Sequence, residues 1–123
     1  MPRVRPPDRR ASWTQKARIG GMACYLGFGE DKEGRLCEVF ITCNKEGTLV
    51  RGLLDALARV ASTALQCGAS AGEVAGAMRN CNFPPNGPAF RNGEMLICSS
   101  LADWVAQEIE AAYGDHRDAK AGK

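Results

Sequence analysis

The chain has 123 residues, of which 45% are hydrophobic and 24% are charged, and this composition fits one globular domain rather than a disordered or fibrous protein. Its formal net charge of +2 argues against a dedicated duplex-DNA binder, which normally carries a large excess of basic residues. No apolar run approaches the roughly 18 residues that a membrane-spanning helix needs, and the first residues do not resemble an export signal, so we expect a soluble, cytoplasmic protein.

The two ends of the chain differ in composition from its middle. Residues 1–11 combine four arginines with three prolines and few apolar side chains, which predicts a flexible basic arm. Residues 114–123 are mostly polar and predict a tail that adds nothing to a core. We therefore expect a single α+β domain over residues 12–113.

Three segments in the first third of the domain show the alternation of apolar and polar residues that is typical of strands. The first runs over residues 13–19, where Lys16 and Arg18 share one face with Thr14. After a turn at residues 20–21, the second segment runs over residues 22–29, and a polar loop leads to the third over residues 37–43. These segments predict a three-stranded antiparallel sheet.

The period then changes to 3.6, which predicts a long helix over about residues 48–67 that covers the sheet. Its apolar stripe consists of Val50, Leu53, Leu54, Leu57, Ala61, Ala64 and Leu65. Gly68 follows where a left-handed C-terminal cap belongs. Ser70 with Glu73, and Ser100 with Asp103, are capping-box patterns, so two shorter helices are expected after them.

The prolines of residues 81–88 predict a loop between the two shorter helices. The expected fold is thus α+β, with a three-stranded antiparallel sheet followed by a long covering helix and two shorter helices.

Six cysteines are spread through apolar segments without any Cys-x-x-Cys pair, and the one histidine, His116, lies in the polar tail. We interpret the cysteines as reduced, small hydrophobic residues of a cytosolic core. Structural zinc sites need clustered cysteine or histidine ligands at short spacings, so no metal site is predicted.

Several motifs follow one another in the order found in a known family. They are Thr14-Gln15-Lys16-Ala17-Arg18-Ile19-Gly20-Gly21, Tyr25-Leu26, Glu38-Val39-Phe40-Ile41, Lys45-Glu46-Gly47-Thr48, Leu53-Leu54-Asp55-Ala56-Leu57-Ala58 and Phe83-Pro84-Pro85-Asn86-Gly87. With them, most of the chain from Trp13 to Ile109 resembles the TSCPD-type domain near the C-terminus of adenosylcobalamin-dependent (class II) ribonucleotide reductases, here expected as a stand-alone protein.

The motif that names this family is altered. At the position of Thr-Ser-Cys-Pro-Asp the chain has Ser99-Ser100-Leu101-Ala102-Asp103, so the serine and the aspartate fit a helix cap while Leu101 replaces the cysteine. No motif matches the barrel, the radical cysteine or the cobalamin site of those reductases. The resemblance therefore implies an accessory module for nucleotide binding or regulation in deoxynucleotide and DNA metabolism, without catalysis or a cofactor of its own.

One candidate site surrounds the predicted start of the long helix, where unpaired N–H groups attract anions. Gly47 would let a phosphate approach the backbone, Thr48 would donate a hydroxyl group, and Lys45 and Arg51 would neutralise charge. The simpler interpretation is a strand-to-helix turn in which Thr48 caps its own helix. It is favoured because the sequence matches no glycine-rich nucleotide fingerprint.

A second candidate site lies on the sheet and a third in the proline-rich loop. Lys16 and Arg18 project from one strand face with Tyr25 as a predicted neighbour across the hairpin, so cations and ring would clamp a nucleotide. A solvated, charged sheet face is the alternative. Phe83 either forms part of a lid over a ligand or fills the edge of the core.

No group of residues predicts catalysis, because His116 has no nucleophile beside it and the acidic residues Asp55 and Glu73 lie on separate helices. The expected partners are a nucleotide ligand, a nucleotide-metabolising enzyme or a second copy of the chain, and no membrane. Two alternatives stay open. One is a protein-interaction scaffold, and the other is a single-stranded nucleic-acid binder that stacks bases on Trp13 or Tyr25, which the low net charge makes the less favoured.

Overall fold

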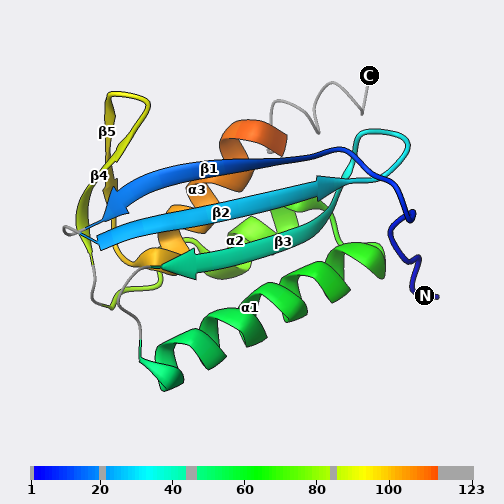
Figure 1. Ribbon diagram of the computed structural model, residues 1–123, viewed down its shortest axis with the longest axis horizontal. Coiled ribbons are helices and arrows are strands. Elements are labelled where there is room, and N and C mark those ends of the chain that lie inside the picture. Colours follow the sequence, from blue (N-terminus) through cyan, green and yellow to red (C-terminus); the bar gives the residue numbers. More distant parts are fainter. Residues whose placement is uncertain (1, 20–21, 44–46, 84–85, 114–123) are drawn as a thin grey trace.

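The computed structural model describes residues 2–19, 22–43, 47–83 and 86–113, and the predicted tail 114–123 and turn 20–21 lie outside these ranges (Figure 1). In chain order the elements are β1 Ser12–Ile19, β2 Met22–Glu30, β3 Leu36–Cys43, α1 Thr48–Gln66, α2 Ala71–Met78, β4 Gly87–Arg91, β5 Glu94–Cys98 and α3 Leu101–Tyr113. The α+β class is confirmed. The predicted number of strands is wrong, because the antiparallel sheet has five strands in the order β3-β2-β1-β4-β5.

The strands missing from the prediction, β4 and β5, form a hairpin around Asn92 and Gly93. Both residues have positive φ, 51° and 83°, as a two-residue type I′ turn requires. Pro88 is paired with Ile97 of β5, and within the described ranges β4 pairs with β1 at Ala89 and Phe90. The loop predicted for residues 81–88 is therefore shorter than expected, because Gly87 and Pro88 belong to β4.

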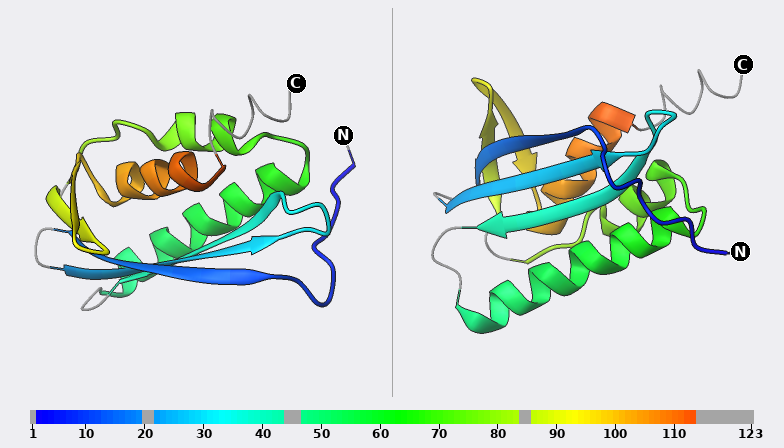
Figure 2. Two further views of the ribbon diagram at one scale, coloured as in Figure 1. Left: turned by 90° about the horizontal axis from the view of Figure 1, so that it is seen from above. Right: turned by 45° about the vertical axis from the view of Figure 1, so that its right-hand side comes forward.

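The three predicted strands are confirmed, and their alternation divides the sheet into two faces. Ala17 and Ile19 of β1 are buried on the inner face, whereas Lys16 and Arg18 between and beside them are exposed on the outer face. The three helices α1, α2 and α3 lie on the inner side of the sheet, and no helix of the part of the chain that the structure describes covers the outer side (Figure 2). The outer face of β1, β2 and β3 is thus accessible to a ligand.

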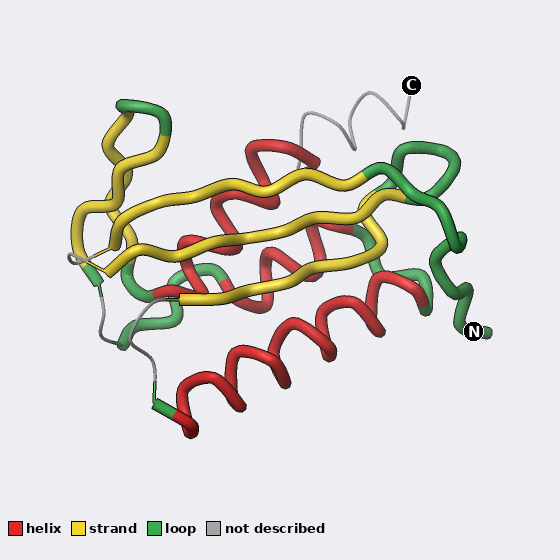
Figure 3. Tube along the Cα trace, viewed as in Figure 1, coloured by secondary structure: helices red, strands yellow, loops and turns green. Residues whose placement is uncertain are grey.

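The core is built around α3, which lies between the sheet and α2 (Figure 2), and Figure 3 shows the strands passing in front of α3. Trp104, Val105 and Ile109 of this helix have no exposed surface. At the end of the sheet where β1 begins, the Trp13 and Phe28 rings pack edge to face with their centroids 4.5 Å apart. The Tyr113 hydroxyl group accepts a hydrogen bond from Trp13 Nε1 at 3.0 Å. The last turn of α3 is thereby attached to β1.

The long helix α1 packs against β3, which is an edge strand, rather than over the centre of the sheet. Its buried stripe is accordingly narrow and consists of Leu54, Ala58, Ala61 and Leu65. The prediction that Val50 and Leu53 belong to the buried stripe is wrong, since they are 43% and 61% exposed. Leu57 is partly buried against the core.

The helix caps predicted at Gly68, Ser70 and Ser100 are confirmed. Gly68 has a φ of 109°, and its N–H donates to Leu65 O at 3.1 Å as in a Schellman cap. Ser70 and Glu73 form the reciprocal capping box at the start of α2. Ser100 Oγ accepts the N–H of Asp103 at 3.0 Å at the start of α3. Among the described residues, no helix has the length and apolar character needed to cross a membrane.

Candidate functional site

The structure brings together three of the predicted site residues on the outer face of the sheet. Lys16 and Tyr25 are cross-strand partners of β1 and β2, and the Lys16 Nζ atom lies 5.7 Å from the centroid of the Tyr25 ring. Arg18 is two residues farther along β1 on the same exposed face, about 6.8 Å away along the strand. One aromatic ring and two cations therefore share an open surface.

Two further aromatic residues lie on this face, and neither was among the predicted site residues. Phe40 of β3 is 55% exposed and lies across Gly27, since a Cβ atom on Gly27 would be 3.5 Å from the Phe40 Cβ. Phe90 of β4 is 52% exposed and is the cross-strand partner of Arg18. The alternation of apolar and polar residues along β3 indicates that Phe40 faces away from the core. Phe90 can be assigned to the outer face only from the structure, because β4 is not among the predicted strands.

Trp13, the other predicted stacking residue, is not on the outer face. Its ring packs against Phe28 and Tyr113 on the helix side of the sheet. Tyr25 is therefore the one of the two predicted stacking residues that remains available to a ligand on the outer face.

The predicted site at the start of α1 is only partly described. Lys45 lies outside the described residues, and so does the side chain of Thr48. Gly47, and not Thr48, occupies the N-cap position, with φ −77° and ψ 176°. The Gly47 carbonyl group accepts the N–H of Arg51 at 3.0 Å and closes the first helical turn.

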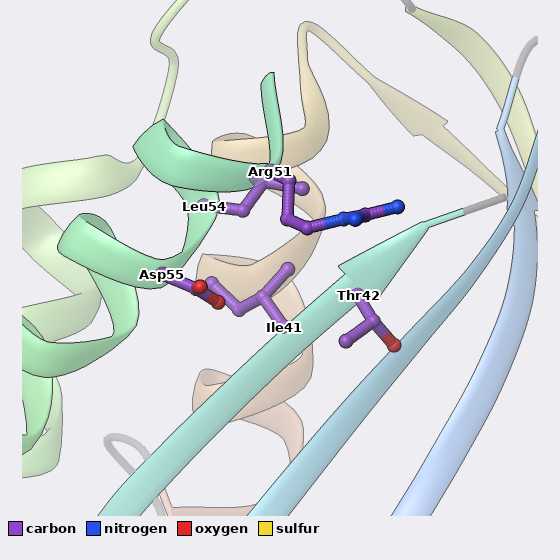
Figure 4. A pocket seen from close by; sticks show the side chains of 5 residues that line it. All are labelled: Ile41, Thr42, Arg51, Leu54 and Asp55. Carbon is purple, nitrogen blue, oxygen red and sulfur yellow. The ribbon is translucent and has the colours of Figure 1, made fainter. Parts of the chain in front are cut away.

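Arg51 contributes to a small pocket between α1 and the end of β3. Its side chain extends from α1 toward the C-terminal end of β3 (Figure 4), and Thr42 and Asp55 also line the pocket. The pocket holds about 100 Å³, well below the roughly 300–1,000 Å³ of small-molecule sites. It has room for a small anion but not for a whole nucleotide. Thr42 is the cross-strand partner of Tyr25, so this pocket adjoins the edge of the outer face.

Phe83 lies apart from the other predicted site residues. It follows α2, its N–H donates to Ser99 O at 3.1 Å next to the start of α3, and the side chain is 41% exposed. This position is neither a fully buried plug of the core nor a part of the outer face.

A larger cleft that the sequence did not suggest lies at the opposite end of the sheet. It holds about 1030 Å³ between the N-terminal arm and the C-terminal end of α1. The arm is attached there by the Val4 N–H, which donates to Gln66 O at 2.8 Å, and by Arg3 Nε, which donates to the Gln66 side chain at 2.7 Å. Its charged lining is mixed, with Arg5 and Arg35 offset by Asp31 and Glu33, so it offers no excess of positive charge to an anion.

The aspartate of the altered Ser-Ser-Leu-Ala-Asp motif is a buried structural group. The Asp103 carboxylate accepts hydrogen bonds from Arg79 Nη1 at 2.7 Å and from the N–H groups of Asn80 at 2.8 Å and Ser99 at 2.9 Å. Burial alone would raise the pKa of Asp103, but these donors lower it to about 2. The motif thus links α2 to α3 through a buried carboxylate.

Residues 2–113 match the TSCPD domain family. The chain is 38% identical over 111 residues to the vitamin B12-dependent ribonucleotide reductase of Bradyrhizobium diazoefficiens and 34% identical over 116 residues to that of Agrobacterium fabrum. These matches cover 90% and 94% of the chain but 9% of each reductase.

A further match, 34% identical, is the vitamin B12-dependent ribonucleotide reductase of Rhodopirellula baltica, of which the chain covers 11%. No solved structure matches the chain significantly. The chain thus spans about a tenth of the length of its curated relatives.

Proposed function

This chain belongs to the TSCPD domain family, and we propose that it is a cytoplasmic accessory module that binds a nucleotide and serves a regulatory role in deoxynucleotide or DNA metabolism, without catalysis of its own. The observation that carries this proposal is the placement of Lys16 over the Tyr25 ring on the open face of the sheet. The kinship with vitamin B12-dependent ribonucleotide reductases supports the choice of nucleotides as ligands.

The outer face offers what a nucleotide needs for recognition. A base presents a flat π-system that stacks on an aromatic side chain, and the phosphates are anions that pair with lysine or arginine. Tyr25 supplies the ring, and Lys16 and Arg18 supply charges at two positions along β1. In this arrangement the base stacks at Tyr25, and the phosphates extend along β1 toward Arg18.

The test is a thermal-shift screen of ribonucleotides and deoxynucleotides, followed by calorimetric measurement of Kd for any nucleotide that raises the melting temperature. At a ligand concentration of about 100 times Kd, binding adds roughly 2.7 kcal/mol to the free energy of unfolding. Lys16→Ala and Tyr25→Ala should weaken binding, whereas Lys32→Ala, which removes the same charge from the turn after β2, should not. If no nucleotide raises the melting temperature of the parent protein, the proposed function is wrong.

A protein-interaction role is the alternative that one specific observation favours. Leu49, Leu53 and Val60 of α1 are 75%, 61% and 67% exposed, and their spacing of four and seven residues places them on one side of the helix. Such a stripe would suit contact with a nucleotide-metabolising enzyme or with a second copy of the chain. Light scattering over a range of protein concentrations would detect self-association, and Leu53→Ser should abolish it.

A further inference from the structure

Cys24 and Cys43 are paired across the β2–β3 ladder, although they are 19 residues apart in the sequence. Both are thiols in the structure, both side chains are buried, and their Sγ atoms are 2.8 Å apart. The distance in a disulfide bond is about 2.05 Å. The two sulfur atoms are therefore already close to bonding distance.

The hydrogen bonds at the edge of β3 show that this pair has the geometry for a disulfide. Ser62 Oγ of α1 accepts the N–H of Val39 at 2.9 Å and donates to the Val39 carbonyl group at 3.3 Å, so the backbone groups of Val39 point away from β2. Residues alternate in this respect along an antiparallel strand, so Cys43, four residues on, also directs its backbone groups away from β2. Cys43 and Cys24 are thus a non-hydrogen-bonded pair.

In such pairs the Cα atoms are about 4.5 Å apart and the side chains approach most closely. That separation falls within the 4.4–6.8 Å range of disulfide-linked residues. The geometry is thus favourable without movement of either strand. We propose that Cys24 and Cys43 form a reversible cross-strand disulfide when the protein meets a low-molecular-weight disulfide, and that this bond locks the ends of β2 and β3 together.

The reaction is a thiol–disulfide exchange in two steps. The Cys43 thiolate attacks one sulfur of the small disulfide, a mixed disulfide forms, and the first small thiolate leaves. The Cys24 thiolate then attacks the Cys43 sulfur and displaces the second small thiolate. The two cysteines lose two electrons and two protons, and the small disulfide is reduced to two thiols. An excess of small thiol reverses both steps.

Other cysteines serve as internal controls. Cys37 lies on the same strand as Cys43 and is also buried, and burial raises the pKa of its thiol. Burial likewise raises the pKa of Cys98 to about 11. Cys81 is exposed and would react first if accessibility alone decided the outcome.

The test equilibrates the full chain in buffers of reduced and oxidised glutathione, blocks the remaining thiols by alkylation, and maps the non-reduced tryptic peptides by mass spectrometry. The expected product is one cross-link between residues 19–32 and residues 36–45, with fragmentation placing the bond at Cys24 and Cys43. This product should exceed any other disulfide at least tenfold in the native protein. In the urea-unfolded chain that preference should disappear.

Cys37→Ser should keep the cross-link, and Cys43→Ser should abolish it, although both variants alter the same peptide. The parent protein should also melt several degrees higher when oxidised, which provides a readout even if Cys43→Ser does not fold. The proposal is overturned if Cys24 and Cys43 remain fully alkylatable under excess oxidised glutathione. It is equally overturned if the native and unfolded chains give the same mixture of disulfides.

Discussion

Arg79 at the end of α2 and Asp103 in the first turn of α3 form an ion pair with a distance of 2.7 Å between Nη1 and Oδ1. The Asp103 side chain is only 2% exposed, whereas that of Arg79 is 37% exposed. The carboxylate also accepts the N–H groups of Asn80 and Ser99 and the Gln107 side-chain amide at 3.0 Å, so four donors stabilise its charge. The ionised Asp103 side chain thus links the start of α3 to the C-terminal end of α2.

The stability of the protein should decrease on acidification as Asp103 becomes protonated. Its pKa is lowered from 3.8 to about 2 in the folded state, so its contribution is complete above pH 3.8 and is lost as the pH falls toward 2. The shift corresponds to up to roughly 2 kcal/mol of unfolding free energy. Urea unfolding at a series of pH values would measure it. Asp103→Asn should be less stable near neutral pH and should lack this part of the acid dependence, so an unchanged slope would contradict the assignment.

Two neighbouring leucines of α1 should respond very differently to truncation. Leu54 is 8% exposed and faces β3, so Leu54→Ala should lower the unfolding free energy by roughly 2–5 kcal/mol. Leu53 is 61% exposed, so Leu53→Ala should change it by no more than about 0.5 kcal/mol. Equal losses in chemical denaturation would mean that the exposed stripe is covered in solution.

Substitution of two glycines by alanine should have opposite effects. Gly93 has a φ of 83° in the β4–β5 turn, so Gly93→Ala should destabilise the protein by about 1 kcal/mol despite the open space around it. Gly52 lies within α1, and a Cβ atom there would meet nothing within 4 Å. Gly52→Ala should therefore stabilise by roughly 0.5–1 kcal/mol, as thermal unfolding would show. Destabilisation by Gly52→Ala would argue against an exposed helical position.

Removal of residues 2–10 tests the expected flexibility of the basic arm. The arm contacts the domain through Gln66 and through an ion pair between Arg10 and Glu38, but it buries little apolar surface, since Val4 is 71% exposed. The melting temperature should therefore fall by only a few degrees. A much larger fall would show that the arm is an integral part of the domain, and Arg10→Ala would then report how much the ion pair contributes.

The sequence was sufficient for the elements whose signals are local. Alternation located β1, β2 and β3, and side-chain caps at Ser70 and Ser100 located the starts of α2 and α3. The β4–β5 hairpin is absent from the sequence-based prediction although Asn92-Gly93 is a strong local turn signal, because the prolines before it favour a loop. Without this hairpin, the sequence does not indicate that Phe90 is a neighbour of Arg18.

The orientation of α1 could not be deduced from its own pattern. Its apolar residues occupy more than half of the helix circumference, so periodicity alone does not decide which stripe is buried. The rotation of α1 about its axis is determined by β3. Backbone groups at the edge of this strand form hydrogen bonds with the side chains of Ser62 and Gln66 of α1. With that rotation Leu54 and Leu65 face the sheet, while Leu53 faces solvent.

Variants of Lys16, Arg18 and Arg51 distinguish the outer face from the pocket beside α1 as the place where a nucleotide binds. Lys16 and Arg18 lie on the outer face with Tyr25, whereas Arg51 lies beside α1 in a pocket too small for a nucleotide. If the base stacks on Tyr25, Lys16→Ala and Arg18→Ala should each weaken nucleotide binding several-fold, and Arg51→Ala, an equal loss of charge, should leave Kd unchanged. Calorimetric titration of the three variants measures this.

The salt dependence of binding distinguishes a mononucleotide ligand from single-stranded nucleic acid. A mononucleotide engages two cations here, so its affinity should fall only modestly between low and moderate salt, whereas single-stranded nucleic acid would show a much steeper fall because it releases more counterions. Tighter and strongly salt-dependent binding of an oligonucleotide would identify nucleic acid as the ligand of the outer face. Loss of nucleotide binding in Arg51→Ala alone would instead place the phosphate at the start of α1, where the backbone N–H groups beyond Gly47 would receive it.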